Sequence, residues 1–312
     1  QITTGDDTYM YQPVWSPDGK KLMWAHKKLR LRYVDVATKK ISDAATAQAF
    51  EFNEYVWSTD SRWIAYTRPE METMNKIYVY SLENEKSIEV TDGWYTSGDP
   101  AFSPDGKYLY FISSRDFSPT FSQTEFNISY GDMSRIYLVT LMKSAESPFK
   151  PKSDEVAPKE DKPKDDGKKD EKKDEKKDEK KDDKKEADVS VKVDAEGIKN
   201  RIAVLPIDPS NYRNLNAVGS NLYYIRQGSK DEKPQFNMYD FEERKETNLG
   251  DIGGYEISAD KKKILVSKDR AYYILDLPKG KLDLKDKLDL SGMEVKLDKK
   301  AEWAQMYNEC WR

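Results

Sequence analysis

The chain has 312 residues, of which 37% are hydrophobic and 35% are charged, and its formal net charge is −4. A weakly acidic chain of this composition offers no basic surface to nucleic acid, so we exclude nucleic-acid partners. No apolar run approaches the roughly 20 residues that a membrane span requires. The single cysteine, Cys310, excludes internal disulfides and metal sites built from several thiolates.

A turn signature recurs along the chain with the same internal geometry. In each copy an aspartate follows a serine by two residues and precedes an apolar segment by four, and the copies lie at residues 15–19, 57–61, 102–106 and 257–261. Proline and glycine at the neighbouring positions preset the turn, and the aspartate hydrogen-bonds its own backbone. The turn aspartates are 42 residues apart from Asp18 to Asp60 and 45 apart from Asp60 to Asp105. That period is typical of four-stranded propeller blades.

A second element follows the turns, an alternating apolar and polar segment typical of a half-buried strand. It occurs five times, at 31–36, 77–82, 136–141, 236–241 and 272–277. The fourth occurrence belongs to a unit with a shorter turn at 218–221. We therefore predict an all-β fold, a β-propeller of four-stranded blades with five visible and the array incomplete. A β-sandwich or barrel with similar hairpins is the alternative, but sandwiches lack a repeat of this length.

The longest loop outside the low-complexity region spans residues 112–135 and holds our candidate peptide-contact residues. These are Arg115, Asp116, Phe117, Phe121 and Phe126. Loops at a propeller face commonly bind ligands, and aromatic rings give contact area at low entropic cost. We predict that this loop lines a peptide-binding or gating surface. The alternative is that its rings pack the loop onto the edge of a blade.

A charged insertion interrupts the repeat. Residues 150–186 contain 15 lysines and 15 acidic residues in 37 positions, with no aromatic residue. Such a segment cannot bury enough apolar surface to offset the entropy of ordering. We therefore predict blades at 1–149, a disordered insertion within one blade at 150–200, further blades at 201–297 and a helical segment at 298–312.

The chain lacks the residues of a familiar catalytic centre. Its one histidine, His26, ends a predicted strand, and no Gly-x-Ser-x-Gly elbow is present to supply a nucleophile. The turn aspartates have a structural role. Asp92, Asp99 and Asp116 lie in predicted loops near the third blade and have no paired partner that the sequence identifies. We predict no catalytic, cofactor-binding or metal-binding residue in this chain.

The residues at the two ends of the chain indicate that the sequence is a fragment of a longer protein. Residues 1–5 resemble 89–93, the outer strand of a blade, and residues 298–312 predict an amphipathic helix that continues beyond the sequence, with Asp298 as its N-cap. An unclosed array leaves two exposed sheet edges, so we also predict association, including homo-oligomers.

Three further segments carry a family resemblance. They are Ser147-Pro148-Phe149 before the charged run, residues 201–207 with 211–215, and residues 301–303 with 309–312. Together they resemble the second propeller of the tricorn proteases and the helix that opens their catalytic half. The resemblance implies a large serine-type peptidase, related to the C-terminal processing proteases, whose propellers filter or channel peptides to a separate active site. The implied partners are peptides or unfolded polypeptide and the protein's own downstream PDZ and peptidase domains.

The resemblance carries over no catalytic residue, because none of the family's catalytic motifs falls on this sequence. Bacterial members with lysine-rich insertions are usually exported, which implies a periplasmic protein, although the sequence leaves a cytoplasmic location open. Two other functions stay open. One is a stand-alone protein-binding scaffold of the Tol type, and the other is the propeller of a prolyl-oligopeptidase-like enzyme. A terminal amphipathic helix favours the tricorn-like reading over both.

Overall fold

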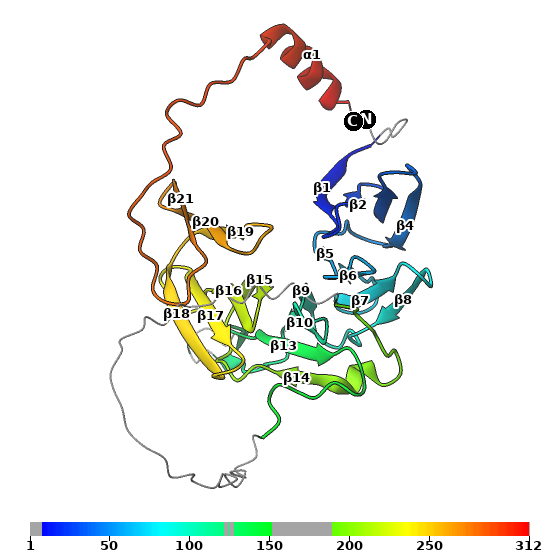
Figure 1. Cartoon of the computed structure of the whole chain (residues 1–312), viewed down its shortest axis with the longest axis vertical. Coiled ribbons are helices and arrows are strands. Elements are labelled where there is room, and N and C mark those ends of the chain that lie inside the picture. The colour runs from blue at the N-terminus through cyan, green and yellow to red at the C-terminus, as the bar shows by residue number, and fades with distance from the viewer. Residues whose placement is uncertain (1–7, 122–123, 125–127, 152–188, 312) are drawn as a thin grey trace, which may run out of the picture.

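The computed structural model describes residues 8–121, 124, 128–151 and 189–311. Five antiparallel sheets are arranged as blades around a common axis and form an arc, with the first strand of each blade nearest the axis (Figure 1). Four of these sheets have four strands and the fifth has three. The prediction of an all-β propeller with five blades is confirmed.

The blades follow one another in chain order. Blade 1 consists of β1 (Met10–Trp15), β2 (Lys21–His26), β3 (Arg30–Asp35) and β4 (Ile41–Thr46). Blade 2 consists of β5 (Tyr55–Trp57), β6 (Trp63–Arg68), β7 (Lys76–Ser81) and β8 (Lys86–Glu89). Blade 3 consists of β9 (Ser97–Phe102), β10 (Tyr108–Ser113), β13 (Arg135–Thr140) and β14 (Ile202–Val204). Blade 4 consists of β15 (Tyr212–Val218), β16 (Asn221–Arg226), β17 (Gln235–Asp240) and β18 (Lys245–Asp251). Blade 5 consists of β19 (Gly254–Ile257), β20 (Lys263–Lys268) and β21 (Ala271–Asp276).

The repeated turn joins the first and second strands of blades 1, 2, 3 and 5. In blade 1 the Ser16 hydroxyl donates to Asp18 Oδ1 at 2.5 Å, and Asp18 Oδ1 accepts the Lys20 amide at 3.0 Å. The same bonds recur at Asp60, Asp105 and Asp260. The turn aspartates are therefore structural, as their spacing predicted.

The core lies between blades, because each sheet is apolar on both faces. Four hydrophobic clusters fill the four junctions between neighbouring blades. In β10, for example, Leu109 packs toward blade 2 and its neighbour Tyr110 packs toward blade 4, and their exposed fractions are 0% and 4%. Adjacent strand residues thus face opposite junctions, and each junction excludes water from large side chains.

The charged insertion leaves blade 3 between β13 and β14, as predicted, but the predicted disordered range of 150–200 is too long. Residues 189–200 pack against the blades, and Val191 and Ile198 are buried in the junction between blades 2 and 3. The Val191 amide donates to Asp60 Oδ2 at 2.8 Å, and the Trp63 indole donates to the Val191 carbonyl at 3.0 Å. The valines at 189, 191 and 193 alternate with polar residues, which allows this segment to order once the charge run has ended. Within the predicted range, residues 152–188 lie outside the described residues.

The segment after β21 continues blade 5 and then crosses toward blade 1. The Leu288 amide donates to the Tyr272 carbonyl at 2.8 Å, so the segment lies along the free edge of β21. Helix α1 (Lys299–Glu309) follows, and its N-cap is Asp298, whose carboxylate accepts the Lys300 amide at 3.0 Å. The Tyr9 hydroxyl, just before β1, donates to the Glu309 carboxylate. The C-terminal segment therefore links the two ends of the arc (Figure 1).

The predicted helix and its cap are confirmed, although the helix ends at Glu309 rather than at residue 312. Residues 1–7, for which we predicted an outer strand, lie outside the described residues. No helix in the described part of the chain is long and apolar enough to cross a membrane.

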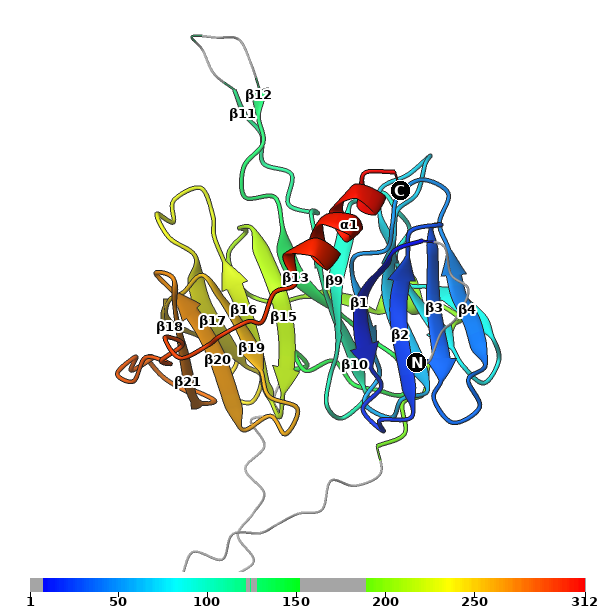
Figure 2. The same cartoon turned by 90° about the horizontal axis from the view of Figure 1, so that it is seen from above.

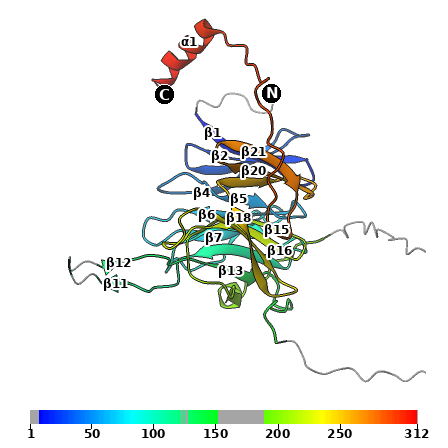
Figure 3. The ribbon, with the colours of Figure 1, turned by 90° about the vertical axis from the view of Figure 1, so that its left-hand side faces the viewer.

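The two faces of the disc carry different elements. A two-stranded hairpin, β11 (Thr120–Phe121) and β12 (Ile128–Ser129), joins β10 to β13 and projects from one face (Figures 2 and 3). The repeated turns lie on the other face, at the opposite ends of the same strands. We call the face with the hairpin the hairpin face.

Candidate functional site

A bulge interrupts the innermost strand of several blades at the same position. Gln12, Asp99 and Asn214 occupy it in blades 1, 3 and 4, each with a positive φ, of 47°, 52° and 59°. In blades 1, 2 and 3 the residue at this position lies six places before the turn aspartate, which places Glu54 there in blade 2. Bulges of this kind re-aim a side chain and end regular pairing.

The residues at the bulge connect each blade to the next. Glu54 Oε2 accepts the Asp99 amide at 2.8 Å, and Asp99 Oδ2 accepts the Leu215 amide at 3.0 Å. Further along the arc, the Asn214 side-chain amide donates to the Tyr255 carbonyl at 3.1 Å. A chain of polar contacts therefore crosses from blade 2 to blade 5 beside the axis.

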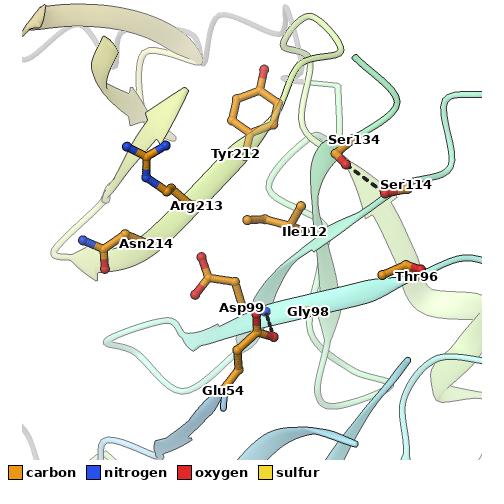
Figure 4. Close-up of a pocket in the computed structure, with 10 residues that line it drawn as sticks. All are labelled: Glu54, Thr96, Gly98, Asp99, Ile112, Ser114, Ser134, Tyr212, Arg213 and Asn214. Atoms are coloured by element: carbon orange, nitrogen blue, oxygen red, sulfur yellow. Dashed lines mark hydrogen bonds between the residues drawn. The ribbon is translucent and has the colours of Figure 1, made fainter. Parts of the chain in front are cut away.

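A pocket of about 460 Å³ opens at this position, where blades 2, 3 and 4 meet (Figure 4). Its walls come from the starts of β9 and β15, the residue before β5 and the two ends of the loop that carries the hairpin. The lining residues are Glu54, Thr96, Gly98, Asp99, Ile112, Ser114, Ser134, Tyr212, Arg213 and Asn214. In Figure 4 the carboxylates of Glu54 and Asp99 lie on one side and Arg213 on another. The pocket thus offers both signs of charge.

The two carboxylates differ in environment. Glu54 is exposed and its Oε2 also accepts the Thr67 hydroxyl at 2.7 Å. Asp99 is half-buried, and burial raises its pKa to about 6, while the Leu215 amide lowers it and the nearby Glu54 carboxylate raises it further. A side chain at Gly98 would collide with the Glu54 carboxylate, because a Cβ there would lie 2.5 Å from Glu54 Oε2. Gly98 therefore makes room for the carboxylate in the pocket.

The base of the hairpin loop holds two of the residues predicted to contact peptide. The Arg115 guanidinium lies over the Tyr137 ring, 5.1 Å from its centroid. Asp116 forms an ion pair with Arg135 at 3.0 Å, a partner that the sequence did not identify. The partner lies 19 positions away in the sequence, and only the antiparallel return of the chain brings it close. These two charged residues anchor the loop to blade 3.

The predicted aromatic residues lie further out. Phe117 and Tyr130 pack against each other across the loop with ring centroids 5.4 Å apart, and they remain 64% and 53% exposed. Phe121 in β11 is also exposed, whereas Phe126 lies outside the described residues. The alternative reading, in which these rings pack onto a blade edge, does not describe Phe117. The hairpin begins and ends at the pocket, because Ser114 and Ser134 line it and their hydroxyls are 2.9 Å apart.

His26 is a buried residue at the end of β2, where its Nδ1 accepts the Lys28 amide at 3.1 Å. Among the residues that the structure describes, no cluster of histidine, cysteine, aspartate and glutamate could hold a metal ion.

Sequence reasoning missed Glu54 and Arg213, and it placed Asp99 in a loop although Asp99 belongs to β9. For Glu54 and Asp99 the repeat did contain a signal, because each is a polar residue six places before a turn aspartate. Asp92, by contrast, does lie in a loop, where it accepts the Trp94 amide at 3.1 Å.

Comparison with known proteins identifies the fold. The family model described as the tricorn protease second beta propeller domain matches residues 1–278. A putative tricorn-like protease C-terminal subunit from Sulfurisphaera tokodaii is 26% identical over 310 residues, which are 95% of this chain and 32% of that protein. A tricorn protease homolog from Saccharolobus solfataricus is 26% identical over 312 residues, which are 95% of this chain and 26% of that protein.

Among solved structures, the crystal structure of the tricorn protease superposes with a TM-score of 0.77 at 21% identity, covering 97% of this chain and 28% of that one. TolB from Acinetobacter baumannii shares the fold more distantly, with a TM-score of 0.53 at 13% identity over 86% of this chain and 52% of that one. The chain spans about a third or less of the length of the tricorn relatives that it matches. With a family model covering most of its length, the chain belongs to the family of tricorn protease second β-propeller domains.

Proposed function

We propose that this propeller is a non-catalytic peptide-binding region that delivers peptides to a serine-type peptidase active site elsewhere in a tricorn-like protease. The observation that carries the proposal is the position of the hairpin. Its exposed rings rise from the rim of a polar pocket beside the propeller axis. Loops on a rigid scaffold with exposed aromatic residues are typical binding elements.

Other exposed apolar residues near the base of the hairpin support the same proposal. Trp94 and Tyr95, in the loop from β8 to β9, are 80% and 43% exposed. Tyr95 lies near the base of the hairpin, with its ring centroid 5.9 Å from the Arg115 guanidinium. A peptide that crosses the hairpin face toward the axis would therefore meet apolar side chains first and the polar pocket next. A periplasmic location and homo-oligomers stay predictions.

Peptide binding to the whole chain tests this proposal. We expect a C-terminally labelled, unstructured dodecapeptide to show an increase in fluorescence anisotropy when the protein is added. The double variant Phe117→Ser/Tyr130→Ser should weaken this binding by about tenfold, because each ring contributes on the order of 1 kcal/mol or more at a contact.

The matched control is Met293→Ser, which removes an exposed apolar side chain from the segment after β21. It should bind the peptide like the unmodified chain. Absence of binding to the unmodified chain, or equal affinity of the double variant and the control, would overturn the proposal.

A further inference from the structure

The negative charge in the pocket is concentrated on one wall. The equivalent position carries an uncharged residue in blades 1, 4 and 5, namely Gln12, Asn214 and Gly254, the last without a bulge, but a carboxylate in blades 2 and 3. Glu54 and Asp99 are therefore neighbours at one junction. Among the five blades that the structure describes, no other blade has an acidic residue at this position.

The fold does not require the charge of Asp99. Asn214 occupies the same position as Asp99 and connects its blade to the next through a neutral amide. An amide oxygen at position 99 could accept the Leu215 amide as the carboxylate does. Burial meanwhile penalises the charged form of Asp99. A carboxylate that is costly and replaceable in its structural role indicates a role toward a ligand.

Another wall of the pocket presents a cation, Arg213. The Arg213 side chain is exposed, and its guanidinium has no hydrogen bond or ion pair with any residue that the structure describes. On the acidic wall, Glu54 Oε2 is used twice, by Thr67 and by Asp99, whereas no described residue bonds Oε1. A ligand here can therefore find an unused acceptor and an unused donor in one pocket.

We propose that this pocket holds the amino terminus of a bound peptide, with the α-ammonium group against Glu54 and Asp99 and the first carbonyl oxygen on Arg213. This inference rests on the proposed function and specifies which part of the peptide is recognised. An ammonium group has three donors and suits a pair of carboxylates, and a guanidinium fork suits a carbonyl oxygen. At the amino terminus the ammonium nitrogen and the carbonyl oxygen are separated by only three bonds. The pocket volume of about 460 Å³ lies within the range of small-ligand sites.

A lysine side chain would also bring an ammonium group, but it lacks an acceptor beside that group for Arg213. The two ligands are distinguishable with N-acetylated peptides that contain lysine. Acetylation removes the charge of the terminus and leaves the lysine charge unchanged.

The experiment measures anisotropy with the whole chain and three C-terminally labelled peptides of otherwise equal sequence. The first has a free amino terminus, the second is N-acetylated, and the third is N-acetylated and contains one lysine. We expect acetylation to weaken binding by at least about tenfold in both acetylated peptides, as expected for the loss of a charged hydrogen-bonded group. Glu54→Gln and Arg213→Met should each weaken binding of the free peptide and leave the acetylated peptides unchanged.

The control variant is Glu256→Gln, which removes an exposed carboxylate from the innermost strand of blade 5, outside the pocket. It should bind all three peptides like the unmodified chain, and thermal unfolding verifies that each variant is folded. Equal binding of free and acetylated peptides would overturn the amino-terminus proposal while leaving the proposed function standing. Recovery of affinity in the third peptide would assign the pocket to lysine side chains instead. Absence of binding by every peptide would overturn both proposals.

Discussion

The third residue of a blade's second strand has different surroundings at the junctions within the arc and on the outer face of blade 5. Tyr110 of β10 and Tyr223 of β16 occupy this position in blades 3 and 4, and they are 4% and 1% exposed. Leu265 of β20 occupies it in blade 5 and is 37% exposed. Beside it on the same face, Ile274 is 56% exposed. The sequence pattern is the same, and the burial differs because only the first two residues face a neighbouring blade.

This difference shows that a blade is apolar on both faces whether or not a neighbour covers it. Most of the stabilisation therefore belongs to the junctions, since burying a side chain of this size contributes about 1.5–3 kcal/mol. The outer face of blade 5 contributes little to folding. It is a surface where the association predicted from the sequence would begin.

The largest expected effect compares two leucines at these two places. Leu222→Ala removes a side chain that is fully buried between blades 3 and 4, and we expect it to lower the free energy of unfolding by about 2–5 kcal/mol. Leu265→Ala should lower it by less than about 1 kcal/mol, because that side chain is already partly in water. Urea unfolding followed by circular dichroism measures both. Similar losses in the two variants would mean that blade 5 is covered in solution.

A smaller effect comes from Asp99, which lies at an inner junction. Burial raises its pKa to about 6 from the ordinary value of 3.8, so the folded state favours the protonated carboxyl. The contribution of Asp99 to stability is therefore complete below about pH 4 and is lost as the pH rises through 6. Asp99→Asn does not titrate. Relative to the unmodified chain, this variant should therefore gain about 3 kcal/mol of stability between pH 4 and pH 8, at 1.36 kcal/mol per pKa unit.

Asp105→Asn is the control for this prediction. Burial alone would raise the pKa of Asp105, but hydrogen bonds from Ser103 and Lys107 hold it below its ordinary value. Its contribution is present above about pH 4 and is lost only in more acidic solution, so the difference between this variant and the unmodified chain should stay constant from pH 5 to pH 8. Urea unfolding across this range measures both variants. A flat profile for Asp99→Asn as well would show that its carboxyl is not shifted.

Local chemistry made much of the fold predictable from the sequence. The turn signature carries its own hydrogen bonds, and the strands beside it alternate with a period of two, so the five blades could be counted in advance. The third strands begin one residue earlier than predicted, as in β7, which begins at Lys76 rather than Ile77. Lysine is a polar residue that belongs to the hydrogen-bonded ladder, and the apolar pattern does not detect it.

The pocket was not predictable in the same way. Its residues come from blades 2, 3 and 4, and Glu54 and Arg213 are 159 positions apart in the sequence. Their proximity depends on how the blades are arranged around the axis, which no local pattern encodes. The hairpin loop was recognised by its composition, but the ion pair between Asp116 and Arg135 that anchors it depends on the return of the chain.

The smallest effect compares the same turn glycine in an end blade and an inner blade. Gly19 has a φ of +67° and open space where a Cβ would lie, whereas Gly106 has a φ of +69° and would place a Cβ 2.9 Å from Val191. Gly19→Ala should therefore lower the free energy of unfolding by about 1 kcal/mol, the cost of a left-handed backbone for alanine. Gly106→Ala should cost about 2 kcal/mol, because Val191 must also move.

Val191 is held at both its amide and its carbonyl, by Asp60 and Trp63, so it cannot shift without breaking these bonds. Hydrogen exchange should accordingly show a protected Val191 amide in the unmodified chain and in Gly19→Ala, and faster exchange in Gly106→Ala. Equal stability losses with equal protection in the two variants would show that residues 189–191 do not pack on blade 3 in solution.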